Sequence, residues 1–380
     1  MPRCEKLRNE PYDHHRKYPI IVLILLQRLR FKLIQPCWEN TTHKNTMNRG
    51  NIVRGVKIAG TGSYVPERIC TNEELEQSAP TTAKWIEANL GIRERRIARP
   101  DQATSDLAVE AAKRALEHAK MKVSDVSLII VATATPDRLA PSTACIVQDK
   151  LGACNAVAFD VSAVCSGFLF GMSIASQFLA AGTYNNALVI GADTFSKIID
   201  WTRRDCCFFG DGAGAAVLTH EPADSQKGFL SFRLYSDGHG REGFTIPGGG
   251  SEFPASAETI KNRLHYFKMD GKAVYEAGTK VLPVAIKEVL KDTGLTINDI
   301  DFLIPHQPSI RILKKTAEIL GLPFERVMTN MDRYANTAGG TIPILLDEVN
   351  RSGRLTSGKH VLFAAVGAGW TWGAAIIRWC

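Results

Sequence analysis

The sequence predicts an α/β protein built from two similar halves. From residue 52 onward, short apolar runs alternate with amphipathic stretches, which is typical of strands buried beneath helices. Two parts of the second half repeat features of the first. Residues 298–300 lead into an expected strand, just as residues 124–126 do in the first half. Residues 360–366 resemble residues 186–191 because each run ends in small residues. We therefore expect an internal duplication, with residues 47–225 and 226–380 as its halves.

The expected elements follow in chain order. In the first half we expect strands at residues 52–59, 128–133, 187–191 and 213–219, with helices at residues 105–119 and 168–181. The second half is expected to begin with a strand at 228–235 and a glycine-rich loop at 236–251. A long helix at 273–293 and strands at 301–305 and 360–366 then follow. The strands are short apolar runs, and the helices repeat apolar residues every three or four positions.

The charge of the chain excludes a nucleic-acid binder. The 380 residues carry a formal charge of +7, but residues 1–46 hold nine Lys/Arg and four Asp/Glu of the 46 and 39 in the whole chain. The remaining 37 basic and 35 acidic residues form no basic stripe, so the electrostatic footprint of a nucleic-acid protein is missing.

The N-terminal segment does not predict a membrane-spanning helix. The longest apolar run, residues 20–26, is far shorter than the roughly 20 residues needed to cross a membrane. We expect residues 1–46 to be an extension outside the fold, either disordered or translated from a start assigned upstream of Met47; a targeting presequence is the alternative.

The nine cysteines show no metal-binding or disulfide spacing, which favours a reducing cytoplasmic setting and no metal.

Two glycine clusters invite a nucleotide-binding interpretation that we reject. The segment from Gly60 to Val65 lacks the third glycine and the acidic partner of a dinucleotide fingerprint. The segment from Gly210 to Gly214 lacks the Lys-Ser/Thr pair of a phosphate loop. We expect its small residues to allow close backbone packing at the start of a strand.

Cys165 is the best candidate nucleophile. It lies between a strand-like run and an amphipathic helix. A thiol at a helix N-terminus faces unpaired N–H groups and the positive end of the helix dipole, so we expect its pKa to be lowered. A buried structural cysteine is the competing interpretation of Cys165 alone.

Two donors complete a plausible acyl-transfer site. His306 follows a predicted strand, where α/β proteins tend to carry chemistry, and Asn336 lies in a run of small residues that allows close approach of a substrate. A thiolate, an imidazole Nε2 donor and an amide donor are sufficient for chemistry on a thioester.

Residues 52–380 resemble the condensing enzymes of the thiolase superfamily, in particular β-ketoacyl-acyl carrier protein synthase III. The matching motifs start at Gly60, Gly91, Pro141, Phe209, Pro305, Asn336 and Gly369, in addition to the segment around Cys165. The resemblance implies a thiolase-like fold, a duplicated five-layer α-β-α-β-α architecture that is normally a homodimer. This agrees with the duplication found above.

The resemblance also implies the reaction. Cys165 would take an acyl group from an acyl-CoA primer, and His306 and Asn336 would bind malonyl-acyl carrier protein (malonyl-ACP) for decarboxylative Claisen condensation. The backbone N–H groups of Cys165 and Ala368 would form the oxyanion hole. The CoA thioester and the phosphopantetheinyl carrier are substrates, and no cofactor enters.

Further roles follow residue by residue. The resemblance places the adenine of CoA on Trp85 with Arg203 or Arg204, and carrier docking on Arg311. At the primer pocket, Ala140 stands where many members have a phenylalanine. Together, Arg138 and the small Ala140 would suit a dicarboxylic primer such as glutaryl-CoA, as in the biotin-pathway members. A solvated Arg138 is the alternative.

Other functions stay open at this point. A cysteine hydrolase would also use Cys, His and Asn in this chain order. A secondary-metabolite ketosynthase of the same fold, forming esters or alkylquinolones, would use the same three groups. A scaffold without activity is disfavoured because all three chemical groups are present.

Overall fold

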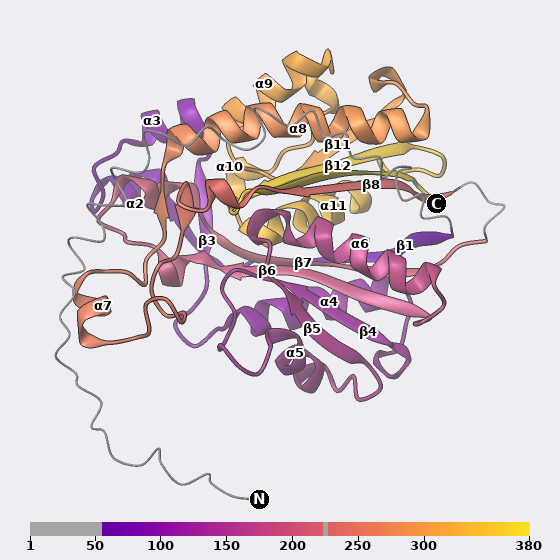
Figure 1. Cartoon of the computed structure of the whole chain (residues 1–380), viewed down its shortest axis with the longest axis horizontal. Coiled ribbons are helices and arrows are strands. Elements are labelled where there is room, and N and C mark those ends of the chain that lie inside the picture. The colour runs from indigo at the N-terminus through magenta and orange to yellow at the C-terminus, as the bar shows by residue number, and fades with distance from the viewer. Residues whose placement is uncertain (1–54, 223–226) are drawn as a thin grey trace, which may run out of the picture. The chain divides into compact units, whose positions relative to one another are not determined.

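The computed structural model of the protein describes residues 55–222 and 227–380. The extension expected at residues 1–46 lies outside the described residues, as do residues 52–54 of the first expected strand. The described part is arranged in five layers, helices alternating with two β-sheets (Figure 1). The expected α-β-α-β-α architecture is therefore confirmed.

The first sheet is built entirely from residues 56–220. Its strand order is β1-β7-β6-β4-β5, with β6, β4 and β5 parallel and β1 and β7 antiparallel to their neighbours. Its strands are β1 (Val56–Tyr64), β4 (Leu128–Ala132), β5 (Val157–Val161), β6 (Asn186–Thr194) and β7 (Asp211–His220).

The second sheet is built entirely from residues 228–378. Its order is β11-β12-β13-β8, parallel between β11 and β12 and antiparallel elsewhere. Its strands are β8 (Gly228–Ser236), β11 (Phe302–Pro305), β12 (His360–Gly367) and β13 (Thr371–Arg378).

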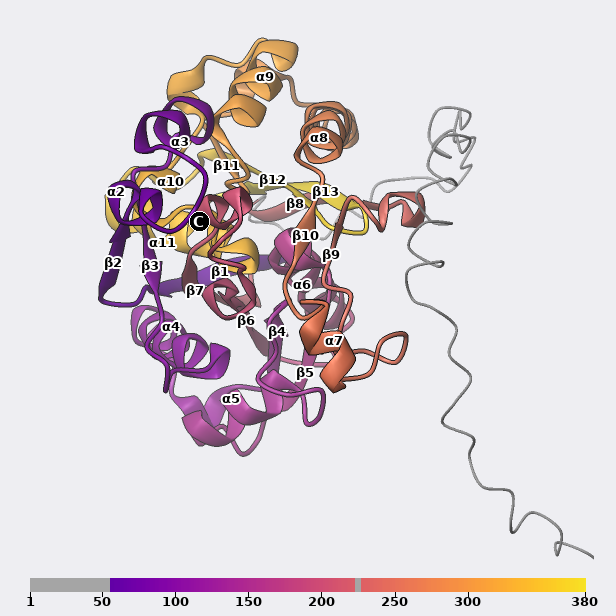
Figure 2. The same ribbon diagram turned by 90° about the vertical axis from the view of Figure 1, so that its left-hand side faces the viewer.

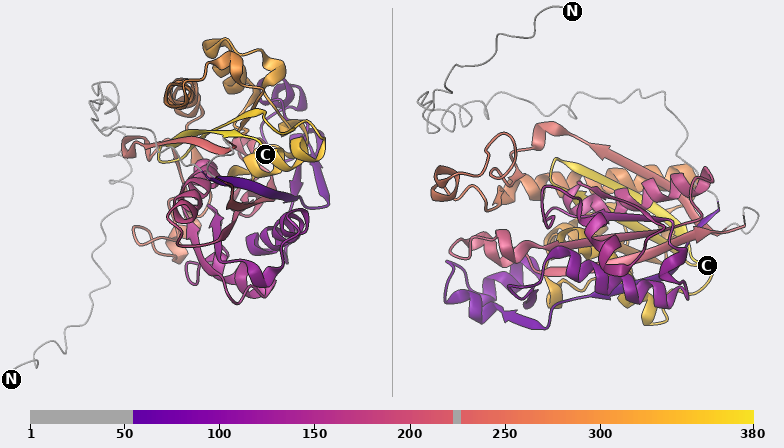
Figure 3. Two further views of the ribbon diagram at one scale, coloured as in Figure 1. Left: turned by 90° about the vertical axis from the view of Figure 1, so that its right-hand side faces the viewer. Right: turned by 90° about the horizontal axis from the view of Figure 1, so that it is seen from below.

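Helices separate and cover the two sheets. The central layer holds α6 (Gly167–Ala180) and α11 (Thr341–Arg351), which contact both sheets. The first sheet is covered outside by α4 (Thr104–His118) and α5 (Thr143–Leu151), and the second by α8 (Gly271–Thr293) and α9 (Ile310–Leu320). Figure 2 and the left panel of Figure 3 show the same stacking from two further sides.

Smaller elements gather at one end of the layers and in the loop after β8. They are β2 (Arg68–Thr71), α2 (Asn72–Glu76), α3 (Ala83–Leu90), β3 (Glu94–Ile97), β9 (Phe244–Thr245), α7 (Ala257–Lys261), β10 (Lys268–Met269) and α10 (Met331–Tyr334). No helix in the described ranges is both long and apolar enough to cross a membrane.

The expected elements are present in the described residues, and the extension of the first strand has a packing cause. Strand β1 runs five residues beyond its expected end at residue 59. It continues through Gly60 and Gly62 because helix α4 lies directly on it: a Cβ at Gly60 would come within 2.5 Å of Ala119 N. The glycine cluster after the first expected strand is therefore a strand packing against a helix.

The second glycine cluster behaves as expected. Strand β7 begins at Asp211, and Gly214 lies against the backbone of helix α11, where a Cβ would be 2.6 Å from both Pro343 C and Ile344 N. The expectation of close backbone packing at a strand start is confirmed.

Candidate functional site

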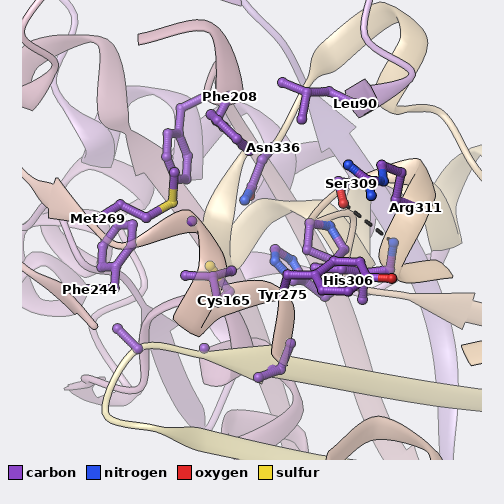
Figure 4. A pocket seen from close by; sticks show the side chains of 18 of the residues that line it. Leu90, Cys165, Phe208, Phe244, Met269, Tyr275, His306, Ser309, Arg311 and Asn336 are labelled. Atoms are coloured by element: carbon purple, nitrogen blue, oxygen red, sulfur yellow. Dashed lines mark hydrogen bonds between the residues drawn. The ribbon is translucent and has the colours of Figure 1, made fainter. Parts of the chain in front are cut away.

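A cavity of about 360 Å³ brings together Cys165, His306 and Asn336 from three distant parts of the chain. Figure 4 shows the three side chains directed toward the same space. Residues from α3, α8 and α9 and the end of β12 complete the walls. Most of the lining is apolar, including Leu90, Phe208, Phe244, Met269, Val366 and Trp370.

Cys165 is placed by a tight turn between β5 and α6. It lies in a single 3-10 turn, Val164–Ser166, that leads directly into α6 at Gly167. Val164 has a positive φ of 47°, which turns the chain sharply before the thiol. The neighbouring Ser166 hydroxyl donates to Ala163 O at 2.8 Å and lies 2.8 Å from Thr371 Oγ1, so the turn is tied to β13.

The environment of the thiol differs from the sequence expectation. Burial raises the pKa of Cys165, and the negative charge of Asp193 raises it further. Hydrogen bonds from the Asn336 side chain and from the backbone amide of Cys165 itself act in the opposite direction. The expected lowering is therefore wrong, because Cys165 is only 7% exposed and a thiolate there loses its hydration. The resting cysteine is a thiol.

His306 stands at the end of β11, held by its backbone and its ring. Its N–H donates to Ala364 O at 2.8 Å, and its Nδ1 lies 2.8 Å from the hydroxyl oxygen of Thr341. Burial lowers the pKa of His306 to about 3, so the ring is neutral near pH 7. A neutral imidazole has one N–H to offer.

Asn336 is fixed with its amide nitrogen available. Its Oδ1 accepts a hydrogen bond from Ala338 N at 2.8 Å, and its backbone N–H donates to Phe208 O at 3.0 Å. Because the oxygen is occupied, the Nδ2 donor is directed to the cavity and to Cys165 (Figure 4).

The predicted oxyanion-hole segment lies against the nucleophile. Ala368 lines the cavity, and the preceding Gly367 closely approaches the backbone at the cysteine. A Cβ at Gly367 would be 3.0 Å from Cys165 N and 2.8 Å from Ala163 O. Only glycine allows the 366–368 segment to come this close.

At the cavity mouth, the structure shows which of two arginines stacks on Trp85, a choice that the sequence left open. The guanidinium of Arg204 stacks on the Trp85 ring, with its carbon 3.8 Å from the ring centroid. Arg203 instead donates to both carboxylate oxygens of Asp205, at 3.1 and 2.8 Å. Trp85 itself lines the cavity.

Arg311, on α9, also lines the cavity. Its guanidinium is 3.5 Å from Asn89 Oδ1 and 5.5 Å from the centroid of the Tyr275 ring. Lys272 also lines the cavity, so the mouth is cationic. A cationic mouth suits thioesters of phosphate-bearing carriers.

The two predicted primer-pocket residues lie elsewhere. Arg138 and Ala140 are exposed, and the cavity of their own subunit does not include them. Between them, Leu139 is 87% exposed. A primer role for Arg138 stays a prediction.

Sequence reasoning missed Asp193, a fully buried carboxylate that ties the site together. Its Oδ1 accepts hydrogen bonds from Ala134 N at 2.8 Å and from the amide and hydroxyl of Thr135 at 3.1 and 2.9 Å. Its Oδ2 accepts from Gly339 N at 2.8 Å. Burial raises the pKa of Asp193 to about 6. An acidic residue two positions beyond the buried strand expected at 187–191 was the available signal.

Fold and site together define a condensing enzyme of the thiolase type: a buried cysteine at the start of the central helix, with a histidine and an asparagine in one cavity. Two family models match, described as 3-oxoacyl-[acyl-carrier-protein] synthase III over residues 159–238 and as its C-terminal part over residues 290–379.

Individual proteins agree with the family models. The β-ketoacyl-[acyl-carrier-protein] synthase III of Caldanaerobacter subterraneus is 51% identical over 323 residues, covering 85% of this chain and 97% of that protein. The synthase III of Desulfitobacterium hafniense is 47% identical over 325 residues, covering 85% and 98%. The crystal structure of the 3-oxoacyl-[acyl-carrier-protein] synthase III of Aquifex aeolicus superposes with a TM-score of 0.79 at 38% identity, covering 86% and 100%.

The chain belongs to the β-ketoacyl-acyl carrier protein synthase III family and is an acyltransferase with the thiolase fold. These relatives do not favour the alternatives in biotin or secondary metabolism.

Proposed function

We propose that this protein condenses an acyl-CoA primer with malonyl-ACP in fatty acid synthesis, releasing CoA and CO₂ and leaving a 3-oxoacyl-ACP. The observation that carries the proposal is the meeting of one thiol and two fixed donors, from Cys165, His306 and Asn336, in a single cavity with a cationic mouth.

In the first step, Cys165 attacks the thioester carbonyl of the primer. The new bond joins Sγ to the acyl carbon, the bond to the CoA sulfur breaks, and the proton of the thiol leaves with CoA. The oxyanion would be stabilised by the backbone N–H groups of Cys165 and Ala368, which the close approach of Gly367 supports.

In the second step, malonyl-ACP enters the cavity of the acylated enzyme. Hydrogen bonds from His306 Nε2 and Asn336 Nδ2 to its thioester oxygen stabilise the enolate that forms as the bond to the carboxylate breaks and CO₂ leaves. The enolate carbon attacks the acyl-cysteine, and the departing thiolate regains a proton from water. The reaction needs no metal or redox cofactor.

We further propose a cytoplasmic homodimer. All cysteines in the described part of the chain are free thiols, as in a reducing compartment. Strand β5 is an edge of the first sheet, with Val157 48% exposed, and Leu139 is 87% exposed. A second copy would cover this edge strand and these apolar side chains.

The three residues have separable roles, and substitution tests them. Cys165→Ala should abolish the acyl adduct seen by mass spectrometry after acyl-CoA is added. His306→Ala and Asn336→Ala should still form the adduct, but condensation should fall by about 10²–10³-fold because each removes a donor to the enolate.

Cys154→Ala is the matched control, since this exposed cysteine lies outside the cavity. It should keep both steps. An adduct in Cys165→Ala, or full condensation by His306→Ala, would contradict the proposal.

A further inference from the structure

Thr341 lies beside His306, at the first position of helix α11. The side chain is buried, and its hydroxyl oxygen lies 2.8 Å from His306 Nδ1 and 3.0 Å from Ala338 O. A threonine hydroxyl has one proton to donate. It either donates to an unprotonated His306 Nδ1, or donates to Ala338 O and accepts from a protonated Nδ1.

The surrounding hydrogen bonds allow the hydroxyl proton to be given to the ring. Ala338 O already accepts the backbone N–H of Thr341. His306 Nδ1 has no other hydrogen-bond partner within the described ranges, and the ring is only 2% exposed. Because Ala338 O keeps its backbone partner, the hydroxyl proton can go to an unprotonated Nδ1, which would otherwise be buried without a donor.

We propose that Thr341 is a positioning residue that donates its hydroxyl proton to His306 Nδ1 and so keeps the imidazole proton on Nε2, facing the cavity. The inference rests on the proposed function, because only condensation requires an N–H donor at Nε2. In the opposite tautomer, Nε2 would present a lone pair to the thioester oxygen and repel it.

Removing the hydroxyl without changing the shape should uncouple the two half-reactions. Thr341→Val leaves Ala338 O with its backbone partner but leaves His306 Nδ1 without a donor. We expect acyl-enzyme formation to change less than about threefold and condensation to fall by about tenfold or more. Thr341→Ser keeps a hydroxyl at the same carbon and should restore most of the condensation rate.

Thr316→Val is the matched control. Thr316 is a buried threonine on α9 whose hydroxyl has no hydrogen-bond partner within the described ranges, and it does not line the cavity. Thr316→Val should leave both half-reactions unchanged.

The tautomer itself is measured by ¹⁵N NMR of protein labelled at histidine, with the His306 signals assigned by their loss in His306→Asn. The wild type and Thr341→Ser should show a protonated Nε2 and an unprotonated Nδ1, and Thr341→Val should lose this bias. A protonated Nδ1 in the wild type, or condensation by Thr341→Val equal to that of the Thr316→Val control, would overturn the inference. Full condensation by His306→Ala would instead overturn the proposed function, so the two failures are distinguishable.

Discussion

Burial controls the protonation of the reactive side chains. Burial lowers the pKa of His306 to about 3, raises the pKa of Asp193 to about 6 and raises the pKa of the Cys165 thiol. In each case burial shifts the balance toward the neutral form because the charged form would lose its hydration. Near pH 7 the Cys165 thiol and the His306 ring are neutral, whereas Asp193 is still ionised. A neutral imidazole is suited to donating a hydrogen bond to an enolate, and a buried thiol limits reaction with other electrophiles.

The lowered pKa of His306 predicts a pH dependence of stability. The unfolded histidine has a pKa of 6.5 and the folded one about 3, so the unfolded state binds more protons between these values. Stability is therefore lost as the pH falls from 6.5 toward 3. Between pH 7.5 and pH 5 this single group should cost about 2 kcal/mol.

Chemical denaturation of the wild type and His306→Asn at both pH values checks this. The variant should lose about 2 kcal/mol less than the wild type on acidification. Asp193 has the opposite effect on stability: because its pKa is raised on folding, stability falls as the pH rises from about 4 to 6. Both proteins contain Asp193, so its contribution cancels in the comparison. Equal losses in the two proteins would show that His306 is protonated without penalty.

At the scale of elements, close backbone contacts place the catalytic segment. Helix α11 and the turn before it approach the first sheet where glycines stand: a Cβ at Gly340 would be 2.8 Å from Gly212 O, and one at Gly214 would be 2.6 Å from Ile344 N. The close approach of α11 to the first sheet brings Asn336 and Thr341 near Cys165. The glycines of β7 therefore support the site without lining its cavity.

Gly214→Ala should separate β7 from α11. The added methyl would meet backbone atoms, which cannot move aside as a flexible side chain could, so we expect a loss of about 3 kcal/mol in unfolding free energy and reduced condensation. Gly238→Ala is the control, because a Cβ there meets nothing within 4 Å. Denaturant titration should find the control within about 0.5 kcal/mol of the wild type. Similar stability of the two variants would refute the role assigned to Gly214.

At the scale of the whole molecule, each half of the described chain supplies one sheet, and the site draws on both. Cys165 comes with the sheet of residues 56–220, whereas His306 and Asn336 come with the part that carries the second sheet. In the proposed homodimer, the second copy would cover the edge strand β5 and the exposed Leu139.

Leu139→Asp should weaken the proposed dimer. An aspartate is tolerated at a position 87% exposed in one subunit but would be desolvated in an interface. Sedimentation velocity should show monomer at concentrations where the wild type is dimeric, with unchanged circular dichroism. Val284→Asp, at an exposed apolar residue of the outer helix α8, should leave assembly unaffected. An unchanged dimer in Leu139→Asp would move the interface elsewhere.

Local patterns were sufficient to predict the fold class, the duplicated architecture and the three residues that meet in the cavity. Each depends on signals that are close in sequence: apolar periodicity, small residues around Cys165 and Asn336, and a polar residue directly after a strand at His306. The family motifs then connected these local signals to one reaction.

Only the tertiary structure decided how the groups interact. In the folded chain, Arg204 rather than Arg203 stacks on Trp85, burial raises the pKa of Cys165, and Thr341 lies beside the ring of His306. These outcomes depend on desolvation and on contacts between residues far apart in the chain, whereas periodicity reports only which face of an element is buried.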